Sequence, residues 1–401
     1  MSGINLDDLE KKVESLSQSK VFDSTINDAV QEVLKTIASA EAEGNSETKT
    51  RLILLKCKAT LVLPSVSKEV EQDLQAVLKR QPDLCEVWID LAECYLRRNA
   101  FGEAENALNN ALRVDAKCTA ALCKLSQVQR NRCSEAGLTI AQKKELLKDS
   151  VQKAHTAVGI DFSSSEAWVA LALATLAQLS IEQTSYTGVK RAAAAIRKAC
   201  ENCDNDPDIH FNKGVIESLL GYFGVAACSF SRAASLDQHR LQGAKYLCHT
   251  NFSVVNRASN RIKLLKTIGK TELKRFTDIA TKSMTTSDKQ TFVVVVADIL
   301  TEPSMQPLSL LTVNAVGEFQ IVLLYNISPT VFRIGQCLTF SSPEGTAEVC
   351  HAIPPLPLID NASLELTIRH YYVNPELLKV NGNGLHRSAY VGLQMSSRLF
   401  A

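Results

Sequence analysis

The chain has 401 residues, of which 45% are hydrophobic and 22% are charged, and its formal net charge at pH 7 is +1. This length allows two or three domains with sizeable cores, and the small net charge gives no global field that favours nucleic acid or an anionic membrane. No uncharged apolar stretch reaches the roughly 18 residues that a membrane span needs. The first residues also lack the basic and then apolar pattern of a signal peptide. We therefore expect no membrane partner.

Twelve Cys residues occur without the regular spacing of a disulfide framework. Several stand where a helix would place a small apolar residue, for example Cys94, Cys123 and Cys228. This usage favours a reducing compartment, in which Cys behaves as a small buried hydrophobe.

The first part of the chain has helical periodicity. Apolar residues recur at intervals of three and four between residues 4 and 43, and Gly44 and Asn45 end the pattern. We expect residues 1–47 to form an N-terminal helical segment. A degenerate helix pair follows, Arg51–Leu63 and Lys68–Arg80, and Pro64 separates its two helices.

The two Trp residues, Trp88 and Trp168, each open the same pattern. From Trp88, a large apolar residue follows at the third position and Tyr95 at the seventh, and a second helix then alternates small and large apolar residues. This is the signature of the tetratricopeptide (TPR) repeat, a helix pair of about 34 residues. The residues that carry it are Trp88, Leu91, Ala92, Tyr95, Ala104, Leu108 and Ala111, and then Trp168, Leu171 and Ala172.

We expect a TPR array over residues 48–240, with repeats at 85–118, 119–164 and 165–206 and a regular repeat from Pro207. The second and third repeats are longer than the standard unit, and we expect their extra residues near Cys133–Thr139 and Ile181–Thr187. Each repeat leaves an apolar face uncovered when alone, so the repeats must stack and the ends of the array need caps.

The helical stretch that follows is expected to cap the array, as basic helices over residues 241–285. Between Arg240 and Lys282 there are ten Lys and Arg residues and only two acids. This charge indicates either a solvated helix face or a surface that contacts phosphates, such as those of ribosomal RNA.

Near Thr286 the apolar period changes from 3.6 to 2, and β-branched residues become frequent. The sequence predicts five strands, at Thr291–Ala297, Leu308–Val313, Phe319–Tyr325, Ile334–Phe340 and Leu364–Tyr372. No helical pattern separates them, so we expect an antiparallel sheet closed into a small OB-like β-barrel over residues 286–401. This region is slightly acidic, so we expect no direct DNA binding and interpret it as a protein-interaction or stabilising module.

The first helix of each TPR pair lines a concave groove, usually through positions 2, 5, 9, 12 and 13. TPR proteins that bind chaperone tails hold a carboxylate with Lys and Asn at positions 5 and 9. That clamp is absent here, because these positions hold Ile89 and Glu93, Cys123 and Gln127, Val169 and Leu173, and Phe211 and Val215.

The groove residues instead favour a ligand of mixed polarity. Val169, Leu173 and Phe211 offer an apolar floor, Arg130 can hold a carboxylate, and Asp208 can hold a guanidinium or an amine. Two alternatives stay open: Arg130 can be a solvated charge or an ion-pair partner within the chain, and Asp208, which follows Pro207, can be the cap of a helix.

Long insertions within the repeats, followed by an OB-like barrel, resemble the tetratricopeptide repeat protein 5 (Strap) family. The resemblance covers residues 48–385 and includes the stretches 125–130, 206–212 and 322–326. It implies an N-terminal all-α TPR superhelix followed by an antiparallel barrel. It also implies recognition of the N-terminal Met-Arg-Glu of nascent tubulin at the ribosome, which triggers decay of tubulin mRNA. The alternative function that it implies is a stress-responsive nuclear cofactor for a histone acetyltransferase and a transcription factor.

Carried over by this resemblance, Arg130 binds the Glu of the peptide and Asp208 binds its Arg, while the Met lies on the apolar floor. Asn212 is expected to bond the peptide backbone. Basic residues of the capping helices are expected to contact the ribosome, and we assign this contact to Lys270, Lys274 and Arg275. The chain departs from the family at Gln242, where an acidic peptide contact is expected.

Catalytic patterns are poor. Gly269, Lys270 and Thr271 resemble the end of a phosphate-binding loop, but Leu264 replaces its first Gly. Cys200 and Cys203 lack the second pair of a zinc site. We therefore expect no catalytic residues, no metal and no cofactor, and we interpret the protein as a non-catalytic adaptor in the cytoplasm and nucleus.

Overall fold

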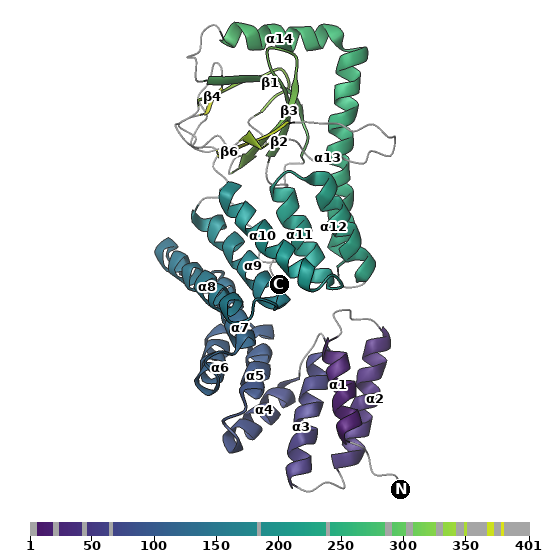
Figure 1. Cartoon of the computed structure of the whole chain (residues 1–401), viewed down its shortest axis with the longest axis vertical. Coiled ribbons are helices and arrows are strands. Elements are labelled where there is room, and N and C mark those ends of the chain that lie inside the picture. The colour runs from purple at the N-terminus through teal and green to yellow at the C-terminus, as the bar shows by residue number, and fades with distance from the viewer. Residues whose placement is uncertain are drawn as a thin grey trace. The chain divides into compact units, whose positions relative to one another are not determined.

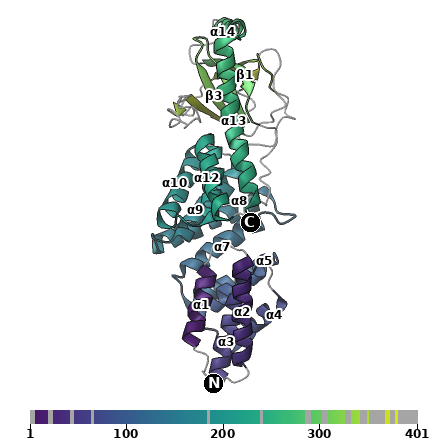
Figure 2. The same ribbon diagram turned by 90° about the vertical axis from the view of Figure 1, so that its right-hand side faces the viewer.

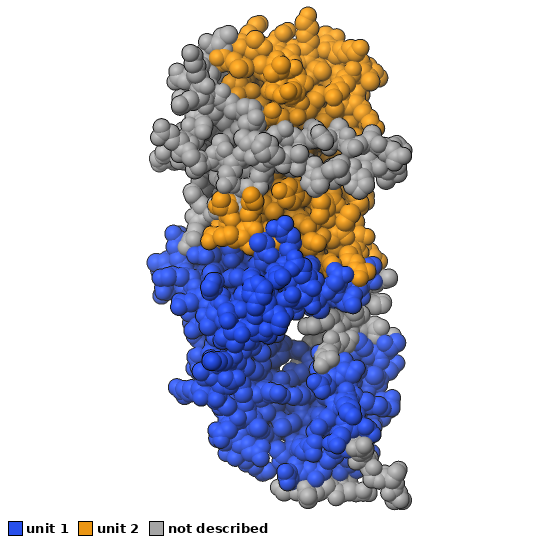
Figure 3. Space-filling view, viewed as in Figure 1, with its two compact units in different colours: residues 1–178, 194–209, 233–242 blue, residues 179–193, 210–232, 243–401 orange. Residues whose placement is uncertain are grey.

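The computed structural model describes residues 6–18, 24–41, 46–63, 67–182, 186–237, 241–284, 291–301, 308–325, 332–341, 349–350, 367–372 and 378–380. Within these ranges, fourteen helices precede a sheet of seven strands (Figure 1). The chain forms two compact units, coloured blue and orange in Figure 3. Unit 1 comprises residues 1–178, 194–209 and 233–242, and unit 2 comprises residues 179–193, 210–232 and 243–401.

Unit 1 begins with the helices that the apolar periodicity predicts. They are α1 (Leu6–Gln18), α2 (Ser24–Glu41) and α3 (Ser46–Leu61). Their apolar positions meet in one core, which contains Leu9, Val13, Val30, Val33, Ile37, Leu52, Leu55 and Ala59. An exposed ion pair between Arg51 and Glu10, 2.7 Å from Nη2 to Oε1, joins α3 to α1.

The next helices of unit 1 are α4 (Lys68–Arg80), α5 (Cys85–Arg97), α6 (Phe101–Val114), α7 (Thr119–Arg132) and α8 (Ile140–Ile160). The signature residues Leu91, Ala92 and Tyr95 of α5 share one core with Ala104, Leu108 and Ala111 of α6, as predicted. The chain reverses between these helices at Asn99, whose φ is +60°. Asn tolerates this left-handed conformation better than most residues do.

The two Trp residues hold the same place in their repeats. The indole N–H of Trp88 donates to the carbonyl oxygen of Pro82, and that of Trp168 donates to the carbonyl oxygen of Phe162, both at 2.8 Å. In each repeat the ring therefore fastens the start of the first helix to the turn before it, which explains why the pattern opens with Trp.

The extra residues of the long repeats mostly extend helices. Residues 133–139 connect α7 to α8, and α8 then runs for 21 residues. Thr139 and Gln142 form a capping box at its start. In the following repeat, α9 (Ser165–Glu182) and α10 (Tyr186–Asn202) occupy most of the expected insertion, and residues 183–185 lie outside the described ranges.

The regular repeat comprises α11 (Pro207–Leu219) and α12 (Phe223–Leu236). Within unit 2 the two helices touch closely at Gly214, where an added Cβ would lie 2.9 Å from ring atoms of Phe230. The Phe211 ring packs on Phe230 edge to face, with ring centroids 5.5 Å apart. The hydroxyl of Ser229 donates to a carboxylate oxygen of Glu217 at 2.6 Å, which joins α12 to α11 a second time.

The predicted basic helices are α13 (Gln242–Thr267) and α14 (Lys270–Met284), and both pack on the sheet. In both views α13 runs alongside the strands (Figures 1 and 2). The core between the helices and the sheet includes Val254, Ala258, Ile262, Leu265 and Phe276 from the helices and Val293, Val295, Leu311, Val313, Ile321 and Leu323 from the strands.

The strands are β1 (Thr291–Ile299), β2 (Leu308–Val313), β3 (Phe319–Tyr325), β4 (Cys337–Ser341), β5 (Val349–Cys350), β6 (Thr367–Tyr372) and β7 (Leu378–Val380). They form one sheet in the order β5-β6-β3-β2-β1-β4-β7. The described pairs are antiparallel except β3 with β6, which is parallel. The prediction of a purely antiparallel sheet is therefore wrong at this pair.

Both faces of the sheet are covered, because a second core lies opposite the one beneath α13 and α14. It contains Val294, Val296, Leu308, Leu310, Val322, Leu324, Phe332 and Leu338. Burial on both faces explains the nearly continuous runs of Val and Leu in β1, β2 and β3. Gly335 lies in the turn just before β4, with φ at +84°.

The Cys residues differ in burial. Cys94 and Cys123 are buried free thiols, and burial raises the pKa of each to about 12. Cys228 is exposed on α12, so the expectation that it is a buried hydrophobe is wrong. None of the described helices combines the length and apolar character that crossing a membrane requires.

Candidate functional site

The predicted groove helices of unit 1 carry a chain of ion pairs. Glu93 of α5 bonds Arg97 at 2.8 Å and Lys124 of α7 at 2.6 Å. Burial alone would raise the pKa of Glu93, but the two cations outweigh it and lower that pKa to about 2. On α3, Lys58 pairs with Glu86 at 2.6 Å. Most charges at the predicted groove positions of α5 are therefore already neutralised within the chain.

Arg97 is a structural residue rather than a free groove charge. Its guanidinium donates to the carbonyl oxygens of Leu61 and Leu63, at 2.8 and 2.7 Å. These bonds satisfy carbonyl groups at the end of α3 that have no partner within the helix.

Arg130 of α7 is in the opposite situation. Nη1 donates to the Ser126 hydroxyl at 3.1 Å, while Nε is buried and has no hydrogen-bond partner. No carboxylate among the described residues forms an ion pair with it. Burial lowers the pKa of Arg130 to about 10, and the guanidinium still stays charged at neutral pH. Of the two open alternatives for Arg130, an internal ion pair is not found among the described residues, and the half-buried side chain is partly solvated.

The position of Arg130 is set by a small polar contact between helices. Ser126 of α7 and Ser150 of α8 are both fully buried, and their hydroxyl oxygens lie 2.9 Å apart. The Ser150 hydroxyl also contacts the carbonyl oxygen of Ser126 at 2.8 Å. This contact holds the hydroxyl group that accepts from Arg130, so α8 helps to orient the guanidinium.

Asp208 lies in the first turn of α11, but it does not cap the helix. The capping side chain is Asp206, whose carboxylate accepts from the backbone N–H of Asp208 at 2.9 Å. Pro207 occupies the first helical position, which suits its missing N–H. The carboxylate of Asp208 is half-buried, and its place in the first turn is favourable for a negative charge.

The other predicted contacts are divided between the two units. Val169 and Leu173 of α9 lie in unit 1 with Arg130 and Asp208, and Leu173 is buried while Val169 is half-buried. Phe211 and Asn212 lie in unit 2, and both are half-buried. The six predicted peptide contacts therefore fall into two groups, four in unit 1 and two in unit 2.

Lys270, Lys274 and Arg275, the expected ribosome contacts, are all exposed on α14. The guanidinium of Arg275 lies 5.6 Å from the centre of the Phe276 ring. The side chain of Gln242 lies outside the described residues. The roles assigned to these residues stay predictions.

Two further charged residues near the predicted groove positions, Asp90 and Lys124, were not among the predicted contacts. Burial raises the pKa of Asp90 to about 6, although Lys58 and Lys124 oppose the shift, and one carboxylate oxygen of Asp90 is buried without a hydrogen-bond partner. The pKa of Lys124 is raised by Glu93, Glu166 and Asp90, which outweigh its burial. Asp90 and Lys124 are one repeat length apart in the sequence, a spacing that would have indicated them.

Comparison with known proteins supports the predicted family. No protein-family model matches the chain. It is 29% identical over 218 residues to tetratricopeptide repeat protein 5 of Mus musculus, and 28% identical to the Homo sapiens protein. The predicted resemblance to this protein is confirmed. The matches cover 52% of this chain and 48% of each relative, so the chain spans about half the length of the curated relatives that it matches.

Among solved structures, the chain is similar to TTC0263, a TPR protein of Thermus thermophilus. The identity is 13% and the TM-score 0.40, with 56% of this chain and 98% of that chain covered. It is also similar to YrrB, described as a TPR protein with an unusual peptide-binding site, at 15% identity and a TM-score of 0.32, covering 54% and 96%.

Proposed function

We propose that this protein is a non-catalytic, peptide-binding adaptor that recognises the N-terminal Met-Arg-Glu of nascent tubulin at the ribosome and so triggers decay of tubulin mRNA. The observation that carries the proposal is the state of Arg130. Its side chain is half-buried, its Nε is buried without a hydrogen-bond partner, and it has one hydroxyl partner and no carboxylate partner among the described residues. Such an arrangement is costly, and a carboxylate brought by a ligand would relieve that cost.

The chemistry of the other predicted contacts fits the remaining residues of such a peptide. The half-buried carboxylate of Asp208 suits a guanidinium. Val169, Leu173 and Phe211 are apolar and suit a Met side chain, which adapts to irregular apolar surfaces. Asn212 offers a carboxamide that can donate to and accept from a peptide backbone.

Three further assignments belong to this proposal. Lys270, Lys274 and Arg275 are exposed and suit contact with ribosomal phosphates. The order β3-β2-β1-β4 is that of a Greek key, which supports an OB-like fold for the sheet. We also propose that the protein works in the cytoplasm and enters the nucleus.

The direct test is fluorescence polarisation with a labelled peptide that begins Met-Arg-Glu, on the full chain and on the variants Arg130→Glu and Asp208→Lys. Each charge reversal should weaken binding by at least about tenfold, because it replaces a charge-assisted bond with repulsion. Arg113→Glu is the matched control, since Arg113 is an exposed Arg of α6, and it should leave the affinity unchanged.

A second peptide, with Glu changed to Gln, separates the two contacts. It should lose affinity for the wild type and show little further loss on Arg130→Glu, because the two changes remove the same interaction. If the wild type does not bind the Met-Arg-Glu peptide, or if Arg130→Glu and Arg113→Glu behave alike, the proposal fails.

A further inference from the structure

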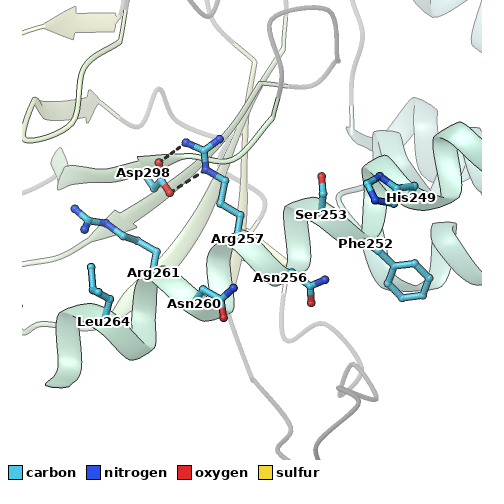
Figure 4. Close-up of a pocket in the computed structure, with 9 residues that line it drawn as sticks. All are labelled: His249, Phe252, Ser253, Asn256, Arg257, Asn260, Arg261, Leu264 and Asp298. Atoms are coloured by element: carbon cyan, nitrogen blue, oxygen red, sulfur yellow. Dashed lines mark hydrogen bonds and ion pairs between the residues drawn. The ribbon is translucent and has the colours of Figure 1, made fainter. Parts of the chain in front are cut away.

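A second candidate binding surface lies on α13, within unit 2. One pocket of about 590 Å³ is lined by nine residues, of which all but Asp298 of β1 come from this helix. Those on the helix are His249, Phe252, Ser253, Asn256, Arg257, Asn260, Arg261 and Leu264. Figure 4 shows the Arg257 side chain directed towards Asp298 and those of Asn256 and Asn260 directed away from that pair. We call this surface the α13 face.

Most of the charge on the α13 face is neutralised within unit 2. Nε and Nη2 of Arg257 donate to the two carboxylate oxygens of Asp298, at 3.0 and 2.9 Å. Arg261 donates to Glu272 at 2.8 Å and to the carbonyl oxygen of Ala297 at 3.1 Å. Nη1 of Arg257 has no partner among the described residues, and 53% of the Arg257 side chain is exposed. Arg261 is less exposed, at 17%, so the more accessible donor of the face is Nη1 of Arg257, and the face is not a row of unpaired cations.

The two carboxamides are the polar groups that remain. Asn256 and Asn260 are exposed, and neither carboxamide forms a hydrogen bond within the described part of the chain. They are four residues apart on a helix, which separates them by about 6 Å along the axis. Two residues of an extended chain span about 6.6 Å. Both carboxamides can therefore bond the same edge of an extended peptide, at alternate residues.

Apolar side chains lie at the two ends of this pair. Phe252 is 42% exposed and Leu264 is 44% exposed. They are twelve residues apart, or about 18 Å along the helix, which corresponds to five or six residues of extended chain at about 3.3 Å each. A peptide of that length would cover both side chains and both carboxamides.

We propose that the α13 face binds an extended peptide segment of a partner protein, with apolar residues towards Phe252 and Leu264 and a carboxylate towards Nη1 of Arg257. The long-range field favours a negative ligand, because α13 and α14 hold far more Lys and Arg than acidic residues. This surface lies on a different helix from Arg130 and Asp208.

Single-stranded RNA is the other class of ligand that a basic helix with an exposed aromatic ring can bind. The α13 face suits it less well. RNA carries a phosphate at every nucleotide and is held by several cations, whereas both Arg residues of this face are already paired with carboxylates. The spacing of the two carboxamides matches two residues of an extended chain, so the face suits a peptide backbone better than it suits RNA.

The test begins with selection of random dodecapeptides displayed on phage against the immobilised full chain. The enriched peptides are synthesised with a fluorescein label and titrated by fluorescence polarisation. The binding variant is Asn256→Ala combined with Asn260→Ala, and its matched control is Asn109→Ala, an exposed Asn on α6. Because Ala favours a helix more than Asn does, these changes do not weaken α13 itself.

We expect enriched peptides that combine Asp or Glu with apolar residues within six positions. The double variant should bind them at least about tenfold more weakly, since it removes two peptide hydrogen bonds. Asn109→Ala and Arg130→Glu should stay within twofold of the wild type, which separates this surface from the groove. Enriched peptides that bind the double variant as well as the wild type would overturn the proposal. So would a uridine dodecamer that binds more tightly than any peptide and depends on the same two Asn residues.

Discussion

Arg130 is poorly placed for stability, and we propose that it is retained for binding. Its neighbours Arg97 and Arg132 have carboxylate partners within the chain, Glu93 and Glu105. Arg130 has only the Ser126 hydroxyl group. Buried charges without partners destabilise a fold, and such groups persist where function uses them.

We therefore predict that Arg130→Met raises the free energy of unfolding and abolishes binding of the Met-Arg-Glu peptide. The gain should be about 1 kcal/mol, because an apolar side chain of similar length replaces a desolvated charge. Urea denaturation monitored by circular dichroism measures it, and Arg113→Met on the exposed face of α6 is the control. A loss of stability in Arg130→Met would show that the guanidinium is satisfied in the folded protein.

Asp90 and Glu93 lie one helical turn apart on α5, and their pKa values shift in opposite directions. The pKa of Asp90 is raised to about 6, so between about pH 4 and pH 6 the folded chain holds a proton that the unfolded chain releases. The Asp90 contribution to stability therefore falls as pH rises. The pKa of Glu93 is lowered to about 2, so its contribution is present above pH 4.5 and is lost as pH falls towards 2.

Asp90→Asn should consequently be more stable than the wild type at pH 7, by roughly 2 kcal/mol, and the difference should disappear near pH 4. Glu93→Gln should be less stable at pH 7, by about 2 kcal/mol, because it leaves the half-buried Lys124 without its partner. Urea unfolding at pH 4, 5, 6 and 7 tests both. The same sign of change for the two variants at pH 7 would contradict this account.

At the scale of helices and strands, the sequence predicted those features that depend on the local pattern of residues. The bounds of β2 and β3 are those predicted, since each strand is a β-branched and apolar run between turn residues. The parallel pairing of β3 with β6 was not predictable in the same way. It pairs Gln320 with Thr367 across a long connection that contains β4 and β5. The alternation of apolar residues within a strand does not indicate which distant strand it pairs with. The two- and three-residue strands β5 and β7 are too short to have a period at all.

The candidate site shows the same division. Repeat position together with the family resemblance pointed to Arg130, but its lack of a carboxylate partner among the described residues depends on contacts between helices, which the sequence does not display. The neutralisation of Glu93 depends on Lys124, 31 residues away. The open alternative that Asp208 caps α11 could not be settled from sequence, because Asp206 and Asp208 are both suited to a helix start, and the cap is Asp206.

The packing of α11 against α12 gives a prediction for this scale. Gly214→Ala should lower the free energy of unfolding by about 1–3 kcal/mol, because overpacking forces shifts in a filled core. The new methyl group would lie 2.9 Å from the Phe230 ring, which is buried and packed on Phe211. Thermal unfolding measures the loss.

Gly159→Ala on α8 is the matched control for Gly214→Ala. An added Cβ there meets nothing within 4 Å, so this variant should be unchanged or more stable by up to about 1 kcal/mol. Equal effects of the two substitutions would show that loss of backbone freedom, and not contact with Phe230, governs position 214.

At the scale of the whole molecule, the charge is small in total and uneven along the chain. The net charge is +1, yet α14 exposes Lys270, Lys274 and Arg275 together. If the proposed ribosome contact depends on this local cluster, reversing the charges of the cluster should weaken association with ribosomes more than an equal change of net charge elsewhere in the chain. Screening by salt should then weaken the association of the wild type, because bound phosphates exchange their counterions for these side chains.

We therefore predict that changing Lys270, Lys274 and Arg275 together to Glu reduces co-sedimentation with ribosomes at least about tenfold at low salt and flattens its dependence on salt concentration. The control changes Lys117, Lys144 and Lys148 to Glu, three exposed residues of unit 1, and alters the net charge by the same amount. Binding of the Met-Arg-Glu peptide should survive in both variants. Equal losses of ribosome association in the two variants would assign the effect to total charge and would remove α14 from the proposed contact.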